Sequence, residues 1–167
     1  MIKTFNSLFV TMFGVGKIKF APGTFGSLVT TIILFYLFHS VNLSSNIILI
    51  GLIIIFIYSF YAVSTHTKDT KEKDPGEIVI DELLGQSIPI YLYEVYHGAA
   101  KESSEAIIYY ILFFLLFRYF DIMKPFPVNF FDKNFKNSFG VIMDDICAGL
   151  YVVLTLVCFM VVKSYIL

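Results

Sequence analysis

Five apolar stretches alternate with polar segments along the chain. They cover residues 24–41, 46–64, 78–96, 105–121 and 144–166. Several of them approach the ~20 residues that a helix needs to cross the hydrocarbon layer of a membrane. The third differs, because it carries Asp81 and Glu82 near its start, Pro89 inside it and Glu94 near its end. It could cross the membrane or form a re-entrant or interfacial helix. The pattern therefore predicts an all-α, polytopic membrane helical bundle with about five membrane-embedded helices.

The composition supports a membrane protein. Hydrophobic residues make up 57% of the chain and charged residues only 15%, with a mean hydropathy of +0.79, too apolar for an ordinary soluble domain of this length. The 167 residues predict one domain, residues 1–167. The formal net charge of −1 argues against a nucleic-acid surface. No Ala-x-Ala-like site follows the N-terminal apolar stretch, so we expect no cleaved signal peptide.

The two cysteines are not predicted to form a bridge. Cys147 and Cys158 lie eleven residues apart in one apolar stretch, which on a helix separates them by roughly 16 Å. We expect both to be inert core residues. The sequence does not indicate an oligomeric state.

The basic residues favour five crossings over four. If the chain starts in the cytoplasm and all five stretches cross, only Lys101 and Lys163 fall outside. The ten basic residues then inside are Lys3, Lys17, Lys19, Lys68, Lys71, Lys73, Arg118, Lys124, Lys133 and Lys136. This asymmetry is the one expected of cytoplasmic loops. It also places four polar motifs at one cytoplasmic face: residues 21–27, 74–85, 120–127 and 140–149.

One carboxylate in these motifs needs a cationic partner. Asp121 is predicted at a helix C-terminus, where the macrodipole disfavours an anion and the hydrocarbon layer makes an unpaired charge costly. Arg118, three residues before it, Lys124, three residues after it, or a divalent metal could supply the charge.

Two acidic pairs lie at the same predicted face. Asp81 and Glu82, and likewise Asp144 and Asp145, are expected in first helical turns, where the dipole favours anions although neighbouring carboxylates repel. Small residues follow each pair and would let the helices approach closely; these are Gly85, Ala148 and Gly149. Carboxylates converging at one face favour a hard cation, and Mg²⁺ takes such oxygen ligands together with water and substrate phosphate.

Other interpretations remain open at this point. Acidic residues at helix starts are often only helix caps, and Lys124 could be an ordinary juxtamembrane lysine. A small cation or proton transporter could use the same carboxylates, although transporter acids usually lie near the membrane midplane. A structural membrane subunit could pair them with a partner's lysines. His39, His66 and His97 are scattered and are interpreted as structural or incidental.

Several phosphatase chemistries are poorly supported. A cysteine phosphatase needs an arginine six residues after its cysteine, and Val153 and Ser164 stand at those positions. The chain has no clustered histidine pair and no Asp-x-Asp nucleophile motif. Among these chemistries, the one that remains is metal-assisted hydrolysis by carboxylates with a lysine nearby.

Four blocks together resemble the signature blocks of the phosphatidylglycerophosphatase A family. They are "PGTFGS" (22–27), "DPGEIVIDELLGQ" (74–86), "FRYFDIMKPFP" (117–127) and "GVIMDDICAG" (140–149), in the family's order. The loop 128–139 matches only loosely. The resemblance implies a Mg²⁺-dependent phosphatase of the bacterial inner membrane, multi-pass, whose active site faces the cytoplasm. Its expected reaction removes the terminal phosphate of phosphatidylglycerophosphate, a phospholipid taken from the bilayer, to give phosphatidylglycerol.

The resemblance also implies functional residues. The family's motif positions carry over as Asp74, Asp81, Glu82, Asp121, Lys124, Asp144 and Asp145. All of these except Asp74 are expected to be catalytic. The expected metal ligands are drawn from Asp74, Asp81, Glu82, Asp144 and Asp145. Candidate substrate contacts are Arg118, Lys124, Thr24 and Ser27, with the two basic side chains neutralising phosphate oxygens.

Overall fold

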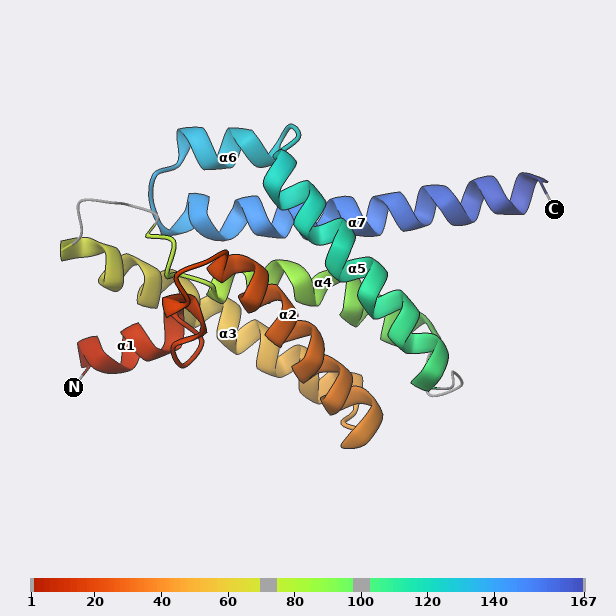
Figure 1. Ribbon diagram of the computed structural model, residues 1–167, viewed down its shortest axis with the longest axis horizontal. Helices are drawn as coiled ribbons and strands as arrows, with labels where there is room; N and C mark the ends of the chain where they lie inside the picture. The colour runs from red at the N-terminus through yellow and green to blue at the C-terminus, as the bar shows by residue number, and fades with distance from the viewer. Residues whose placement is uncertain (1, 70–74, 98–102, 167) are drawn as a thin grey trace.

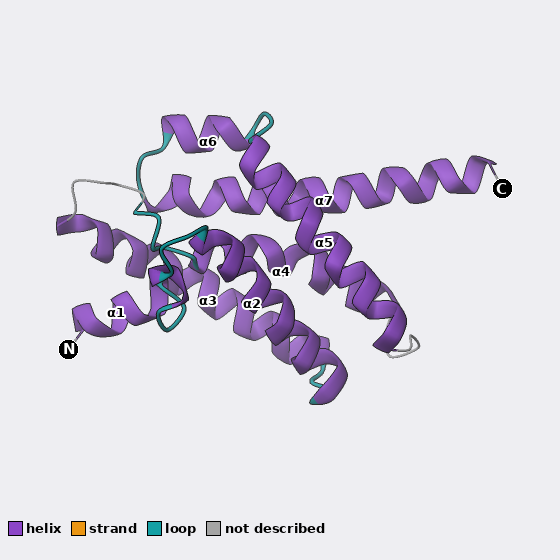
Figure 2. Cartoon of the chain, in the orientation of Figure 1, coloured by secondary structure: helices purple, strands orange, loops and turns teal. Residues whose placement is uncertain are grey.

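The computed structural model describes residues 2–69, 75–97 and 103–166, and within these ranges helices are the only regular secondary structure (Figures 1 and 2). The α-helices are α1 (Ile2–Val10), α2 (Pro22–Phe35), α3 (Ser45–His66), α4 (Ile80–His97), α5 (Ser103–Met123), α6 (Val128–Asn134) and α7 (Ser138–Ile166). Shorter helical turns are η1 (Val15–Lys17), η2 (Tyr36–Ser40) and η3 (Thr67–Asp69). The predicted all-α fold is confirmed.

Four helical segments are long and apolar enough to cross a membrane. They are Pro22–Ser40, Ser45–His66, Ser104–Met123 and Ser138–Val162. Each corresponds to one of the predicted apolar stretches. Large apolar side chains such as Ile54 and Ile57 on α3 are exposed on the protein surface, as expected where lipid rather than water surrounds a helix. The chain is a membrane protein.

The remaining predicted stretch, residues 78–96, forms α4. Among the described residues, α4 is not one of the candidate membrane spans, because of its composition. It carries Asp81, Glu82 and Glu94. Its neighbours in the bundle are α7, α2, α3 and α5, and Figure 1 shows it running through the middle of the assembly. Gln86 and Ser87 on α4 are buried. A helix enclosed by other helices can carry polar side chains that a lipid-facing helix cannot.

One helix boundary changes the interpretation of the acidic pairs. Asp81 and Glu82 do lie in the first turn of α4. The prediction for Asp144 and Asp145 is wrong, because α7 begins at Ser138 and both residues lie beyond its first turn. Their placement is therefore not explained by the N-terminal dipole of the helix. The sequence analysis also did not predict α1 or α6 as helices.

The cysteine prediction is confirmed in one respect and wrong in another. Cys147 and Cys158 are both on α7, and neither forms a disulfide. Cys158 is exposed and so is not a core residue.

Small residues allow α4 and α7 to cross closely. A side-chain carbon added at Gly85 would overlap the backbone carbonyl of Asp145, and one added at Gly149 would overlap the carbonyl of Gly85. The two helix backbones are therefore in direct contact, as the small residues after each acidic pair predicted. The crossing brings the start of α4 against the acidic pair on α7.

The helices alternate in direction, so that one end of the bundle collects most of the polar segments. The N-terminal ends of α2, α4 and α7 lie at this end with the C-terminal ends of α3 and α5 (Figure 1). The short helix α6 packs on α7 there. We refer to this end as the site end.

The helix crossing yields a stability prediction. Gly85→Ala should lower the free energy of unfolding by about 1–3 kcal/mol, because the added methyl group has no room between the two backbones. The measurement is thermal or denaturant unfolding of the purified protein in detergent. Gly51→Ala on α3 is the matched control, because a side-chain carbon there meets nothing within 4 Å. Its half-buried helical site should gain up to about 1 kcal/mol. Equal stability of the two variants would contradict the close crossing.

Candidate functional site

Three carboxylates from two helices form a compact cluster at the site end. Asp81 and Glu82 come from the first turn of α4, and Asp145 comes from α7. One oxygen from each lies within 4.8 Å of the others. Asp81 and Asp145 are only 7% and 4% exposed. We call these three residues the acidic cluster.

The start of α2 forms one wall of the acidic cluster. Pro22 begins the helix, where its missing N–H and restricted φ angle cost nothing. A side-chain carbon added at the next residue, Gly23, would overlap a carboxylate oxygen of Glu82 and lie 3.2 Å from Arg118 Nη1. The glycine therefore provides the space in which Glu82 and Arg118 meet. Ser27, one turn later, is fully buried and receives a long 3.5 Å hydrogen bond from Arg118 Nη1.

Arg118 supplies the positive charge that pairs with Asp121. Its Nη1 lies 2.7 Å from Asp121 Oδ2, one turn apart on α5. Asp121 lies in the last turn of α5, as predicted. It interacts electrostatically with Glu82 and Asp145, so it belongs to the same acidic environment. Of the two basic side chains considered from the sequence, the i−3 arginine is the one in contact with Asp121.

Lys124 joins a different set of carboxylates. Its ammonium group donates to Asp132 Oδ1 at 2.6 Å and to Asp144 Oδ2 at 3.1 Å. Burial lowers the pKa of Lys124, but the hydrogen bonds and charges of Asp132 and Asp144 outweigh it, so its pKa is raised above the ordinary value. The lysine is therefore cationic at neutral pH.

The backbone at Lys124 is strained. Its φ angle is +44°, in the left-handed region that non-glycine residues rarely adopt. The residue follows the last turn of α5 and its N–H bonds to the carbonyl of Phe120. Such strain persists where surrounding contacts hold it, and it is most frequent at functional sites. Here the contacts to Asp132 and Asp144 hold the side chain toward α7.

The site has an excess of negative charge. Its six carboxylates are Asp81, Glu82, Asp121, Asp132, Asp144 and Asp145, and its cations are Arg118 and Lys124. Fully ionised, the group carries a formal charge of −4. Buried carboxylates at this density are stable only with bound protons or a cation.

The acidic cluster could hold a metal ion. Its donors are all carboxylate oxygens, which suits hard divalent cations. Glu82 Oε2 is shielded from solvent and has no hydrogen-bond partner among the described residues. An oxygen in this state is available as a ligand. The residues therefore fit a hard divalent cation.

The structure brings some of the predicted site residues together and places others apart from them. Asp81, Glu82 and Asp145 are brought together, and Asp121 lies beside them with Arg118. Asp144, predicted as a metal ligand, has a carboxylate oxygen on Lys124, and its role as a ligand stays a prediction.

The two hydroxyl candidates lie on α2. Thr24 is half-buried in its first turn, and Ser27 is within reach of Arg118. Their contact with substrate stays a prediction. Asp74 lies outside the described residues.

Two residues of the site were missed in the sequence. Asp132 comes from α6, in a loop that matched the family only loosely, and only its contact with Lys124 reveals it. Gln86 is one turn after Glu82 on α4, is fully buried, and has no hydrogen-bond partner for either amide atom among the described residues. A fully buried amide is unusual enough to indicate water or another polar group beside it. Its i+4 spacing from Glu82 was the available signal.

Comparisons with known proteins give a consistent result. A family model described as phosphatidylglycerophosphatase A matches residues 8–160. A phosphatidylglycerophosphatase A of Haemophilus influenzae is 37% identical over 142 residues, covering 85% of this chain and 80% of the relative. One of Escherichia coli is 32% identical over 139 residues, covering 82% and 73%. A Bacteroides thetaiotaomicron protein, provisionally named a phosphatidylinositol-3-phosphatase, is 34% identical over 142 residues and 84% of each chain. No solved structure matches the chain.

Adjacent aspartates on α7 provide a test of the acidic cluster. If the acidic cluster holds a divalent cation, Asp145→Asn should weaken binding of that cation, with Mg²⁺ as the probe, by more than the ~100-fold typical of losing an outer-shell partner, because the substitution removes a charged oxygen donor. Asp144→Asn should weaken it by ~10-fold or less, because that carboxylate contacts Lys124. Calorimetric titration of the purified variants measures both. Equal losses would assign Asp144 to the metal as well, and no loss in Asp145→Asn would exclude the cluster as the metal site.

Proposed function

This chain belongs to the phosphatidylglycerophosphatase A family and is a phosphatase, and from that premise we propose that it hydrolyses the terminal phosphomonoester of phosphatidylglycerophosphate with Mg²⁺ as cofactor. The observation that carries the proposal is the buried acidic cluster beside two cations. A phosphomonoester is dianionic, so a site of carboxylates alone would repel it. Arg118 and Lys124 supply positive charge at the edge of the cluster.

The proposed metal ligands are Asp81, Glu82 and Asp145. Mg²⁺, when bound, would neutralise phosphate oxygens and lower the pKa of a coordinated water. Asp121 would hold Arg118 in place through their ion pair, and it adds negative charge beside the ligands. Gly23 would keep the space open in which Glu82 and Arg118 lie together.

Lys124 is the proposed phosphate-binding cation. An ammonium group has three N–H donors, and in the described residues two of them go to Asp132 and Asp144. The third can donate to a phosphate oxygen without breaking either contact. Asp132 and Asp144 would thus position the lysine and limit its movement. A cation held in advance stabilises the charge that develops on the phosphoryl group as it is transferred.

The lipid nature of the substrate agrees with the position of the site. The acidic cluster lies at the site end, where α2 and α4 begin and α5 ends, so a head group at the membrane surface could reach it while the acyl chains remain in the bilayer. Transporter carboxylates usually lie near the midplane on interrupted helices. The site-end position favours a phosphatase over the transport alternative.

We further propose that the protein lies in the bacterial inner membrane with the site end facing the cytoplasm. The basis is the asymmetry of basic residues. Lys17 and Lys19 belong to the segment that leads into α2, and Lys124, Lys133 and Lys136 belong to the segment between α5 and the start of α7; both segments lie at the site end (Figure 1). Cytoplasmic loops carry such an excess.

Cysteine accessibility tests this orientation. In a chain with Cys147→Ala and Cys158→Ala, a cysteine at Lys133 should react with a membrane-impermeant reagent only after the cytoplasmic side is opened. A cysteine at Glu105, at the opposite end of the bundle, should react from outside in intact cells. The reverse pattern would place the site end outside.

The enzymatic activity gives the main test. Purified protein should release phosphate from phosphatidylglycerophosphate when Mg²⁺ is present and not after chelation. Lys124→Ala should lower kcat by about 10²-fold, the loss typical of one transition-state charge partner. Lys133→Ala is the matched control, because Lys133 is an exposed lysine on the neighbouring helix α6, and it should retain wild-type activity.

Three outcomes would contradict parts of the proposal. Full activity without divalent metal would remove the cofactor role. Near-normal activity of Lys124→Ala would make it an ordinary juxtamembrane lysine. Phosphate release from phosphatidylinositol 3-phosphate alone would transfer the substrate assignment to that suggested by the name of the Bacteroides relative.

A further inference from the structure

An apolar groove runs along α7 from the site end. Its lining includes Cys147, Leu150, Leu154 and Val157, which recur at intervals of three or four residues and so share one face of the helix. The groove has a volume of about 500 Å³, within the range of ligand pockets. Cys147 and Val157 are ten residues apart, so the groove follows α7 for roughly 15 Å.

One end of the groove adjoins the proposed phosphate-binding cation. Cys147 lies one turn after Asp144, whose carboxylate contacts Lys124 at 3.1 Å. Pro127 also lines the groove and is three residues after Lys124. The polar site and the apolar groove are therefore continuous along α7 and the segment that follows α5.

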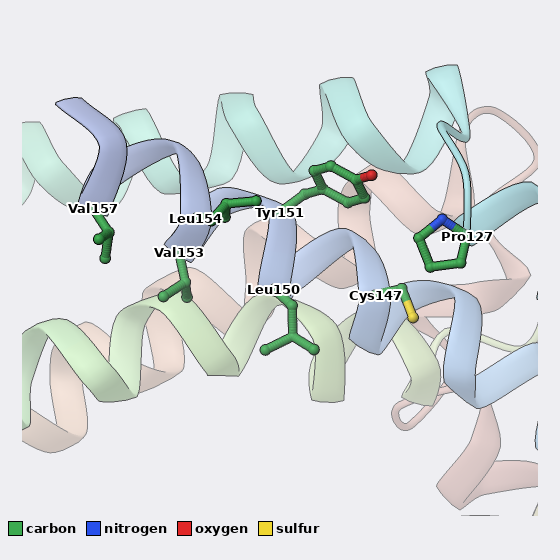
Figure 3. Close-up of a pocket in the computed structure, with 7 residues that line it drawn as sticks. All are labelled: Pro127, Cys147, Leu150, Tyr151, Val153, Leu154 and Val157. Carbon is green, nitrogen blue, oxygen red and sulfur yellow. The ribbon is translucent and has the colours of Figure 1, made fainter.

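Tyr151 closes this end of the groove without adding an open polar group. Its hydroxyl donates to the backbone carbonyl of Phe126. In Figure 3 the ring is directed toward Pro127. Because the hydroxyl is hydrogen-bonded, the ring contributes an apolar wall and ties the 126–127 segment to α7.

The groove is open to the bilayer along its length. Leu150, Leu154 and Val157 are each about half exposed, and no lining residue is charged. In a membrane the surface they present would meet hydrocarbon rather than water. A flexible apolar chain could enter such a groove from the side, whereas a polar ligand would lose its hydration without gaining hydrogen bonds.

We propose that this groove binds one acyl chain of the phospholipid substrate, with the head group at Lys124 and the chain running along α7 toward Val157. The proposal rests on the proposed phosphatase function. An acyl chain is apolar and flexible, and the groove begins beside the phosphate-binding cation and leads away from it. Seating the chain there sets the depth and direction at which the phosphomonoester reaches the acidic cluster.

Substitutions along α7 test the groove by acyl-chain length. Val157→Trp should lower kcat/KM for palmitoyl-chain substrate by about tenfold, mainly through KM, which corresponds to losing burial of about two methylene groups. Its kcat/KM for the hexanoyl-chain substrate with the same head group should stay within about twofold of wild type, because that chain is too short to fill the groove. Leu150→Trp, nearer the cation, should impair both substrates.

Val161→Trp is the matched control. Val157 and Val161 are the same residue type one turn apart on α7, 49% and 48% exposed, and only Val157 lines the groove. Val161→Trp should leave both substrates unchanged. Equal effects at the two valines, or equal effects of Val157→Trp on long and short chains, would show that the groove holds only bulk lipid and would overturn the proposal.

The same variants separate the groove from the head-group assignment. If the wild-type protein releases phosphate from phosphatidylinositol 3-phosphate instead of phosphatidylglycerophosphate, the proposed reaction fails. The chain-length series is then run on that lipid, since the acyl chains are common to both. If Val157→Trp no longer distinguishes long from short acyl chains, the result supports the groove as the acyl-chain site with either head group. If Val157→Trp still distinguishes them as the wild type does, the groove proposal is overturned.

Discussion

The close crossing of α4 and α7 at Gly85 and Gly149 decides where the polar residues of this protein meet. The two backbones touch there, so neither position has room for a side chain. Asp81 and Glu82 lie one turn before the crossing on α4, and Asp145 lies one turn before it on α7. The carboxylates of two helices are thereby brought within 4.8 Å of one another. Larger residues at the crossing would separate the helices and disperse the cluster.

The two cations of the site have separate structural partners. Arg118 pairs with Asp121 one turn away on α5, which places the guanidinium beside Glu82 and Gly23. Lys124 pairs with Asp132 and Asp144, which draws the end of α5 toward α6 and α7. The two cations do not balance the six carboxylates of the site, and this leaves a negative region at the end of the bundle. Binding a divalent cation there would remove repulsion between buried carboxylates and make the region receptive to phosphate.

The bundle also explains why α4 is more polar than its neighbours. The other long helices present broad apolar surfaces to lipid, whereas α4 packs against helices on several sides. A carboxylate or amide on α4 can meet polar groups of other helices, as Glu94 does with His39 and Tyr110 at the end opposite the site. The groove along α7 has the reverse character, because its apolar side chains have no helix covering them and remain open to hydrocarbon.

The sequence by itself determined the membrane environment and the five long helices, because hydropathy and helical spacing are local properties. It also indicated that Asp121 needs a cationic partner, but only the structure selected Arg118 from the alternatives. The start of α7 at Ser138 was not predictable from the hydrophobic pattern, since Phe139 and Val141 are separated from the apolar stretch by two aspartates. Only the tertiary structure decided that Asp145 faces Asp81 while its neighbour Asp144 faces Lys124. Adjacent residues on a helix point about 100° apart, so their partners depend on which helix lies on each side. For the same reason the sequence did not reveal Asp132 as a site residue, because its contact with Lys124 depends on the packing of α6 against α7.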